Sequence, residues 1–441
     1  MTHLEWKKHP LFTGTLILTV TGLASRFIGF FNRIFLTHTI GATGLGIYQL
    51  IFPILTLCLS LCTGGIQTAV SKLTAERDDE APLYCGVSIS LALSAGCAAF
   101  LYICAPFLAK RVVSEPACAP LIRIVSLSLP FACLHSCFNG YYYGKNKTAI
   151  PAFSQLLEQS VRVFSVYLFY LIAQEKGAPV TPALAMWGVV CGEAASSLFC
   201  LTTFRFRRTH LSLCASAAMA GRVTRFAAPL TGSRVVLNLF ASAEAILIPS
   251  ALVAHGCGRD DALSIFGTLT GMAMPVIMLP TVLTGSLSVL LLPVISEAAA
   301  KNDSCRVRQT IRRTVELCVI SGLLCTLAFL LFGQLAGNLL FHSALAGSFI
   351  RSLGWMCPFL FLTGTLSSIL HGLDLPFFTF VLNLLCCGLR LFTIYALVPR
   401  FGLHIYLWSM LASHILQALS YLWVLTRIGR RTGRAVTRAA A

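Results

Sequence analysis

Charged side chains are scarce in this chain of 441 residues, since Asp, Glu, Lys and Arg together make up 11% of it. About 25% is usual for a soluble globular domain. Hydrophobic residues make up 56%, and the mean hydropathy is +0.80. Apolar stretches of about 20 residues, the length that crosses a bilayer as a helix, recur along the whole chain. The shortage of charge therefore excludes an ordinary soluble domain and indicates a helical protein that spans a membrane many times.

Patterns typical of metal sites and disulfide frameworks are also missing. The ten histidines form no HExxH or HxH pattern, and the pairs Cys58/Cys62 and Cys133/Cys137 are spaced by four residues instead of forming CxxC. Nearly all of the 18 cysteines lie inside apolar runs, so we expect reduced thiols that pack as small apolar side chains. We expect no metal site, no cofactor and no catalytic residues.

Acidic residues are half as frequent as basic ones, 16 against 33, which gives a formal net charge of +17. A basic excess can indicate a nucleic-acid partner, but here it follows the loops between apolar runs. One set of alternate loops carries most of it, including Lys72, Lys145, Arg222, Arg312 and Arg427. The opposite set holds little beyond Lys110, Arg111, Lys176, Arg259 and Arg400. This asymmetry predicts that both termini are cytoplasmic and that the basic side chains meet anionic lipid, with no nucleic-acid partner.

We predict an all-α polytopic membrane protein with about twelve spans. They lie near 11–36, 46–70, 83–109, 119–140, 151–173, 183–204, 223–250, 264–293, 313–333, 346–370, 376–398 and 403–426.

The second half of the chain echoes the first. "GKNKTAIPAFSQLLEQSVRVFSVY", which starts at Gly144, aligns with "GLDLPFFTFVLNLLCCGLRLFTIY", which starts at Gly372, at a constant offset of 228 residues. Such matches in order along the chain indicate a duplication. We therefore expect two pseudo-symmetric six-helix bundles, 1–208 and 223–441, joined by a cytoplasmic connector, 209–222, with a basic tail after the second. Two parallel repeats of this kind can enclose a central cavity.

Four arginines lie within the predicted spans, two in each half: Arg26, Arg162, Arg234 and Arg390. Each costs roughly 3 kcal/mol at the centre of a membrane helix, so together they cost about 12 kcal/mol if they face lipid. They must face a partner or a hydrated cavity. Because the guanidinium fork matches phosphate oxygens, a cavity rich in arginine is typical of a transporter for an anion.

Acidic partners offer a structural alternative for two of these arginines. Gln155, Glu158, Gln159 and Arg162 form one polar stripe on a helix, in which Glu158 can neutralise Arg162. Glu244 is the corresponding partner for Arg234, whereas Arg26 has no acid within helical reach. Arg390 has only Asn383 nearby. We predict a substrate-binding cavity that contains Arg26, Arg234, Arg162, Arg390, Glu158, Gln155, Glu244 and Asn383.

Helix-breaking residues inside or next to the spans are candidates for moving parts. Pro53, Pro275 and Pro280 are the hinge candidates, although a membrane helix also tolerates proline without bending functionally. The glycine-rich "GATGLG" at 41–46 follows an apolar run instead of a strand, so we predict a tight turn there and no phosphate loop.

Three blocks of sequence carry a family resemblance: "SRFIGFFNRIFLTHTIGATGLGIYQLIFPI", "GYYYGKNKTAIPAFSQLLEQSVRV" and "GTLTGMAMPVIMLPTVLTGSLSVLLLPVISEA". They resemble the stage V sporulation protein B group of polysaccharide and lipid-linked oligosaccharide flippases, in the superfamily that also holds multidrug exporters and lipid II flippases. The resemblance implies a V-shaped, two-bundle fold of the multidrug-exporter type with rocker-switch motion. It also implies export of an undecaprenyl-diphosphate-linked saccharide.

The first-helix pattern "SRxxGFxR" of the lipid II flippases matches Ser25, Arg26, Gly29 and Phe30, with Arg33 displaced by one place. The resemblance thus implies that Arg26 meets the diphosphate. We expect a monomer in the bacterial cytoplasmic membrane, with the lipid-linked saccharide as substrate and cell-envelope synthesis proteins as candidate associates. We expect the membrane potential, Na⁺ or H⁺ to supply the energy.

Two other classes of function remain open. A cation-coupled multidrug antiporter needs carboxylates in its cavity, and Glu158, Glu193 and Glu244 are available. A membrane-embedded glycosyl transferase needs a sizeable polar loop outside the membrane. The only polar cluster in the short outside loops is "HGCGRDD" at 255–261, so we expect no enzyme.

Overall fold

The computed structural model describes residues 10–77, 79–204, 213–282, 284, 285, 291, 295 and 304–439. These residues form helices, turns and bends, with no strand among them. They divide into two compact units, Met1–Ile246 and Leu247–Ala441, and the division falls inside α8. The predicted connector, 209–222, begins outside the described residues and runs into α8, which starts at Leu213.

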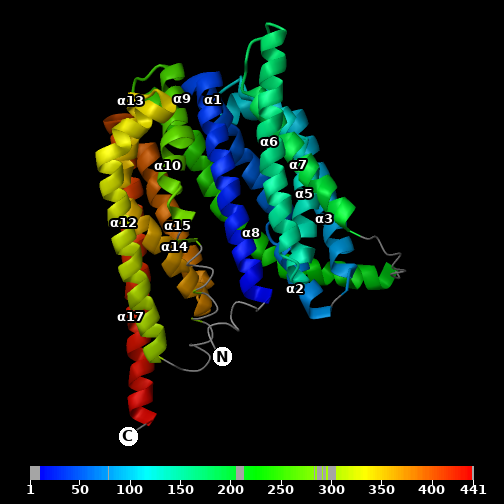
Figure 1. Cartoon of the computed structure of the whole chain (residues 1–441), viewed down its shortest axis with the longest axis vertical. Coiled ribbons are helices and arrows are strands. Elements are labelled where there is room, and N and C mark those ends of the chain that lie inside the picture. The colour runs from blue at the N-terminus through cyan, green and yellow to red at the C-terminus, as the bar shows by residue number, and fades with distance from the viewer. Residues whose placement is uncertain are drawn as a thin grey trace. The chain divides into compact units, whose positions relative to one another are not determined.

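The first unit holds the helices up to α8 (Figure 1). They are α1 (Pro10–Thr63), α2 (Ile66–Arg77), α3 (Ala81–Phe107), the π-helix η2 (Leu108–Val112), α4 (Cys118–Ser126), α5 (Ser128–Gly144), α6 (Ala149–Glu175), α7 (Ala183–Thr203) and the part of α8 (Leu213–Ala254) up to residue 246. Within this unit α6 packs along both α7 and α1, and α5 packs against α2, α3 and α7.

The first two predicted spans are continuous in α1, apart from one break. Gly41 has φ 69° and ψ 179°, a backbone conformation that side-chain-bearing residues avoid, and the chain is helical on either side of it. The prediction of a tight turn over 41–46 was therefore too broad, because one glycine suffices to break the helix. Pro53 lies inside the helical segment, and its carbonyl oxygen accepts a hydrogen bond from Ser242 Oγ of α8 at 2.8 Å.

Small residues set the helix spacing in the core of the first unit. A Cβ at Gly140 of α5 would lie 2.5 Å from the carbonyl oxygen of Gln67, and one at Gly144 would lie 2.5 Å from that of Ser71. Two glycines spaced by four residues thus let α5 approach the backbone of α2 closely, as is common between membrane helices. Tyr141 lies on the same helix, and its ring meets other aromatic side chains edge to face.

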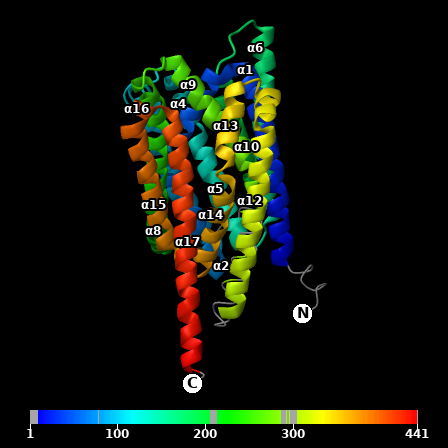
Figure 2. The same ribbon diagram turned by 90° about the vertical axis from the view of Figure 1, so that its left-hand side faces the viewer.

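The second unit, shown in Figure 2, holds the end of α8 and the helices after it. These are α9 (Arg259–Gly267), the π-helix η3 (Thr268–Ala273), α10 (Met274–Met278), α12 (Ser304–Phe341), α13 (Ala344–Gly354), α14 (Cys357–Gly372), α15 (Pro376–Phe392), the π-helix η4 (Thr393–Leu397), α16 (Val398–Phe401) and α17 (Leu403–Ala439). Helix α14 packs against α12 and α17 around the buried rings of Phe361 and Tyr421. Pro275 lies at the start of α10, directly after η3, and Pro280 lies in the turn that follows α10.

The backbone repeats with the offset found in the sequence. Helix α5 ends at Gly144 and α14 at Gly372, the two glycines that open the aligned blocks. Non-glycine residues with positive φ also recur 228 residues apart, Ser114 with His342 and Asn146 with Asp374. The bent pair α4 and α5, at 40°, corresponds to the bent pair α13 and α14, at 58°. The two units therefore share the bent helix pair and the positive-φ breaks on either side of it.

Eight helices among the described residues are long and apolar enough to cross a membrane, or up to ten when each bent pair counts as one span. The longest candidate, Ile17–Glu76, contains the second predicted span, 46–70, and most of the first, 11–36. The predicted span 264–293 runs into residues that the structure does not describe.

Candidate functional site

Three helices of the first unit bring ionisable side chains together in what we term the charge cluster: His135 of α5, Glu158 and Arg162 of α6, and Glu193 of α7. Arg162 Nη2 donates a hydrogen bond to Glu158 Oε1 and lies 3.8 Å from Glu193 Oε1. The side chains are 11–17% exposed. The predicted pairing of Glu158 with Arg162 is therefore present, and a second carboxylate joins it.

Glycines of α7 bring Glu193 to this position. A Cβ at Gly192 would lie 2.8 Å from the carbonyl oxygen of Glu158, and a Cβ at Gly188 would lie 3.0 Å from that of Arg162. No larger side chain fits between the two backbones at these points. The neighbouring Glu193 is thus held beside α6, at the level of its ion pair.

His135 closes the cluster on the side of α5. Its Nδ1 lies 3.6 Å from Glu193 Oε2 and 4.0 Å from Glu158 Oε2, and its Nε2 lies 2.7 Å from Asn139 Nδ2. One ligand atom each from His135, Glu158 and Glu193 lies within 4.8 Å of the others, a spacing compatible with a bound ion. The hydrogen bond from Arg162 already occupies one carboxylate oxygen, and its positive charge opposes a metal cation.

Helix α1 adds a second arginine to the surroundings. Arg33 and Tyr48 of α1 both interact electrostatically with Arg162. Sequence reasoning noted Arg33 only as a displaced match to a family pattern, and it missed His135 entirely. The i, i+4 spacing of His135 and Asn139 was the available signal, but it does not identify partners on other helices.

Two of the predicted cavity arginines are placed differently from Arg162. Arg26 lies midway between the start of α1 and the break at Gly41, and its side chain is exposed. Arg234 is also exposed, near the middle of the candidate span Ala217–Ala254, and its Cδ lies close to Gly64. Gln155, one turn before Glu158, is exposed as well.

Glu244 does not neutralise Arg234 within α8. The helix is continuous over both positions, and ten residues of α-helix span about 15 Å at the usual rise. A direct ion pair needs a separation of about 4 Å, so this alternative from the sequence is wrong. Glu244 itself is buried, with 8% of its surface exposed.

In the second unit, Arg390 and Asn383 lie on one face of α15, directed towards α17. Arg390 Nη1 donates to Ser413 Oγ at 3.3 Å, and Asn383 Oδ1 accepts from Gln417 Nε2 at 2.7 Å. Gln417 also donates to the hydroxyl of Tyr421 at 3.0 Å. The partners of Arg390 that the structure identifies here are neutral, in contrast to those of Arg162.

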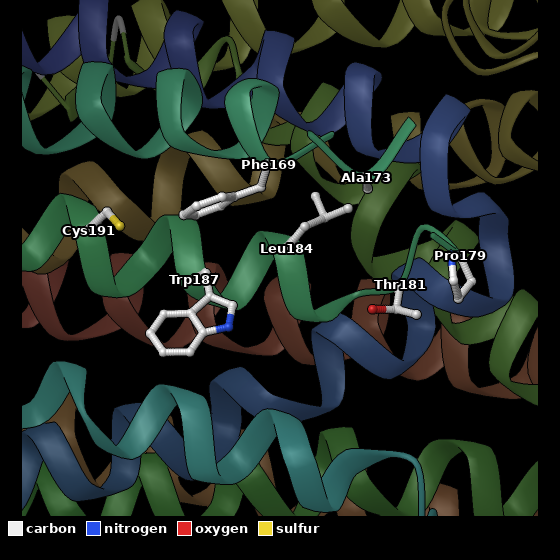
Figure 3. A pocket seen from close by; sticks show the side chains of 7 residues that line it. All are labelled: Phe169, Ala173, Pro179, Thr181, Leu184, Trp187 and Cys191. Atoms are coloured by element: carbon white, nitrogen blue, oxygen red, sulfur yellow. The ribbon is translucent and has the colours of Figure 1, made fainter. Parts of the chain in front are cut away.

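A cavity of about 580 Å³ lies between α6 and α7 (Figure 3). It is lined by Phe169, Ala173, Pro179, Thr181, Leu184, Trp187 and Cys191. At about 100° per residue, Cys191 and Glu193 point to opposite sides of α7. This apolar cavity is therefore separate from the charge cluster and offers no positive group to an anion.

Comparison with known proteins assigns the chain to a family. The model of the polysaccharide biosynthesis protein family matches residues 11–299. Stage V sporulation protein B of Bacillus subtilis (strain 168) is 30% identical over 83% of this chain and 74% of that relative. The chain belongs to the polysaccharide biosynthesis protein family.

Solved structures agree on the fold. The lipid II flippase MurJ in an inward closed conformation has a TM-score of 0.74 at 14% identity and covers 93% of this chain and 87% of its own. An inward-facing multidrug resistance MATE transporter of the MOP superfamily has a TM-score of 0.72 at 15% identity, with 95% and 96% covered. This member of the polysaccharide biosynthesis protein family is thus a multi-pass membrane protein with the fold of the MurJ and MATE structures, as the sequence predicted.

Proposed function

We propose that the chain exports an anionic, lipid-linked saccharide, of the undecaprenyl-diphosphate-linked class, by alternating access. Family membership supports a flippase, as does the similarity of the chain to stage V sporulation protein B and to the lipid II flippase MurJ. The chemistry of the exposed and half-buried arginines within the spans supports the negative charge of the substrate.

The observation that carries this proposal is the exposure of Arg26 and Arg234 within apolar spans. A guanidinium that faces lipid at the middle of a span costs roughly 3 kcal/mol. Exposed arginines at such positions are therefore best explained by a hydrated surface that an anionic head group can reach. A diphosphate offers several oxygens to the planar fork of each guanidinium.

In this mechanism the arginines hold the diphosphate while the prenyl chain stays in the lipid. The loop charges support an orientation with both termini in the cytoplasm of a bacterial cell. With that orientation, an inside-negative potential of about 100 mV favours outward movement of each uncompensated negative charge by about 2.3 kcal/mol. The membrane potential is thus a sufficient source of energy.

Replacing Arg26 or Arg234 with alanine should lower the rate of flipping about tenfold or more, because each change removes a charge-assisted hydrogen bond worth about 1.5–3 kcal/mol. The measurement uses proteoliposomes that contain a fluorescently labelled undecaprenyl-diphosphate-linked sugar. Dithionite added outside the vesicles reports the fraction of label that has reached the outer leaflet.

Arg123→Ala is the matched control, since Arg123 is an exposed arginine of the same unit that stacks on Tyr102 instead of lying mid-span. It should flip the probe at the wild-type rate. Wild-type rates for both Arg26→Ala and Arg234→Ala, in protein that remains folded, would refute the assignment of these arginines to the substrate.

The charge cluster favours a second candidate, a cation-coupled multidrug antiporter. Glu158 and Glu193 are largely buried carboxylates, 12% and 14% exposed, within a MATE-like fold, the type of group that attracts cations. Expression in a host that lacks its own drug pumps separates the two candidates. A flippase should leave sensitivity to cationic dyes unchanged, whereas an antiporter should raise resistance.

A further inference from the structure

Two buried polar atoms of the charge cluster make no hydrogen bond, the donor Arg162 Nε and the acceptor Glu193 Oε2. Glu193 Oε2 is buried and makes no hydrogen bond, although His135 Nδ1 faces it from 3.6 Å. A buried carboxylate oxygen without a hydrogen bond is costly. Because Glu158 and Glu193 also oppose each other electrostatically, a proton shared between them would relieve both penalties.

The hydrogen bond between Asn139 and His135 determines where such a proton goes. Asn139 Nδ2 carries only hydrogens, so His135 Nε2 accepts. The neutral imidazole then carries its hydrogen on Nδ1, directed at the carboxylate oxygens of Glu158 and Glu193. An added proton therefore belongs to the carboxylate pair, with the histidine beside it as a donor.

Charges from the neighbouring helix complete the balance. Arg33 and Tyr48 of α1 interact electrostatically with Arg162 of the cluster. With the histidine and tyrosine neutral, the two arginines and the two carboxylates cancel. One added proton leaves a net positive charge and weakens the hold of the carboxylates on Arg162.

We propose that Glu158, Glu193 and His135 form a proton-binding site that controls the charge which Arg162 presents to an anionic ligand. In the deprotonated state both carboxylates engage Arg162. In the protonated state one carboxylate is neutral, and the guanidinium attracts an anion more strongly. Proton binding and anion binding then strengthen each other reciprocally. The control of anion binding rests on the anionic substrate of the proposed function, whereas the proton site itself does not.

The duplication shows that this site is specific to the first repeat. At the offset of 228 residues, Arg162 corresponds to Arg390. The positions equivalent to Glu158 and His135 hold Cys386 and Thr363, and the side chain of α17 that Arg390 contacts is Ser413. The second repeat therefore keeps the arginine but has no carboxylate at these positions.

Infrared difference spectra of the purified protein in nanodiscs, recorded between about pH 5.5 and pH 8, test the proton site directly. The wild type should show a protonated-carboxyl band at the lower pH. Glu193→Gln and Glu158→Gln keep the size of the side chain and should each remove or shift that band. Glu175→Gln is the matched control, because Glu175 lies exposed at the end of α6, and it should leave the band unchanged.

Binding of farnesyl diphosphate to the same samples tests the link to the anion. For each variant we define the pH ratio as its affinity for the probe at the lower pH divided by its affinity at the higher pH. The pH ratio of the wild type should be about tenfold larger than that of Glu193→Gln, since couplings of 5- to 150-fold are typical. Titration of the probe itself affects all variants equally, so it cancels when the pH ratios of the wild type and the variant are compared. Size-exclusion profiles confirm that each variant remains folded.

Identical infrared bands in the wild type and in both glutamine variants would overturn the proton site. If Glu193→Gln alters the infrared band but has the same pH ratio as the wild type, the proton site does not control anion binding. A normal band together with no farnesyl diphosphate binding at any pH would contradict the anionic substrate of the proposed function and leave the proton site standing.

Discussion

Replacing Arg162 with methionine is expected to lower the free energy of unfolding by about 3–5 kcal/mol, the range found when one partner of a buried ion pair is removed. The substitution leaves the largely buried Glu158 and Glu193 without the cation that both face. Methionine keeps most of the side-chain volume, so the loss reports on charge more than on packing. Thermal unfolding in detergent, followed by the fraction of monodisperse protein, measures it.

Removing the carboxylates together with the arginine should restore most of this stability. The triple variant Arg162→Met, Glu158→Gln, Glu193→Gln removes the carboxylates together with the guanidinium that they face, and replacement of a whole ion pair is often close to neutral. Arg390→Met is the comparison in the second repeat and should cost less, because its identified partners, Ser413 and Cys387, are neutral. Equal stability of Arg162→Met and the wild type would show that the ion pair contributes nothing to the fold.

The sequence predicted the part of this cluster that lies on one helix. Glu158 and Arg162 are four residues apart, and helical periodicity alone places them on one face. Glu193 and His135 join them only through tertiary packing, which depends on glycines at positions 188 and 192 of α7. Those glycines look ordinary in an apolar span, so their spacing alone does not indicate that α7 approaches α6 at that level.

The fold was predictable to a similar depth. Hydropathy and the repeat predicted helices in two related halves, and the recurrence of positive φ at Ser114 and His342 agrees with the offset read from the sequence. The break in α1 was harder to place, because glycine-rich "GATGLG" permits several turns. Only Gly41 adopts the unusual backbone. The pairing of Glu244 with Arg234 failed because an unbroken α8 holds them too far apart.

Gly65→Ala is expected to destabilise the first unit by about 1–3 kcal/mol, the usual cost of overpacking. Gly65 lies between α1 and α2, where the chain meets α8, and its amide donates a hydrogen bond to Thr231 Oγ1 at 3.0 Å. A Cβ at this position would overlap the carbonyl oxygen of Ala227 and lie 2.7 Å from Thr231 Oγ1. Because a backbone carbonyl cannot rotate away like a side chain, α2 and α8 must separate to make room.

Gly96→Ala is the matched control for this change. Gly96 lies on α3 with nothing within 4 Å of its added Cβ, so alanine there should be neutral or stabilise the helix by up to about 1 kcal/mol. Thermal unfolding of the two variants in the same detergent should therefore move in opposite directions or differ clearly in size. Equal melting temperatures for both variants would mean that α8 does not pack on Gly65 as closely as the backbone geometry indicates. If Gly65→Ala separates α2 from α8 as expected, the exposed Arg234, which lies on α8 beside Gly64, should lose its fixed position. The rate of flipping and the stability are therefore expected to fall together in Gly65→Ala.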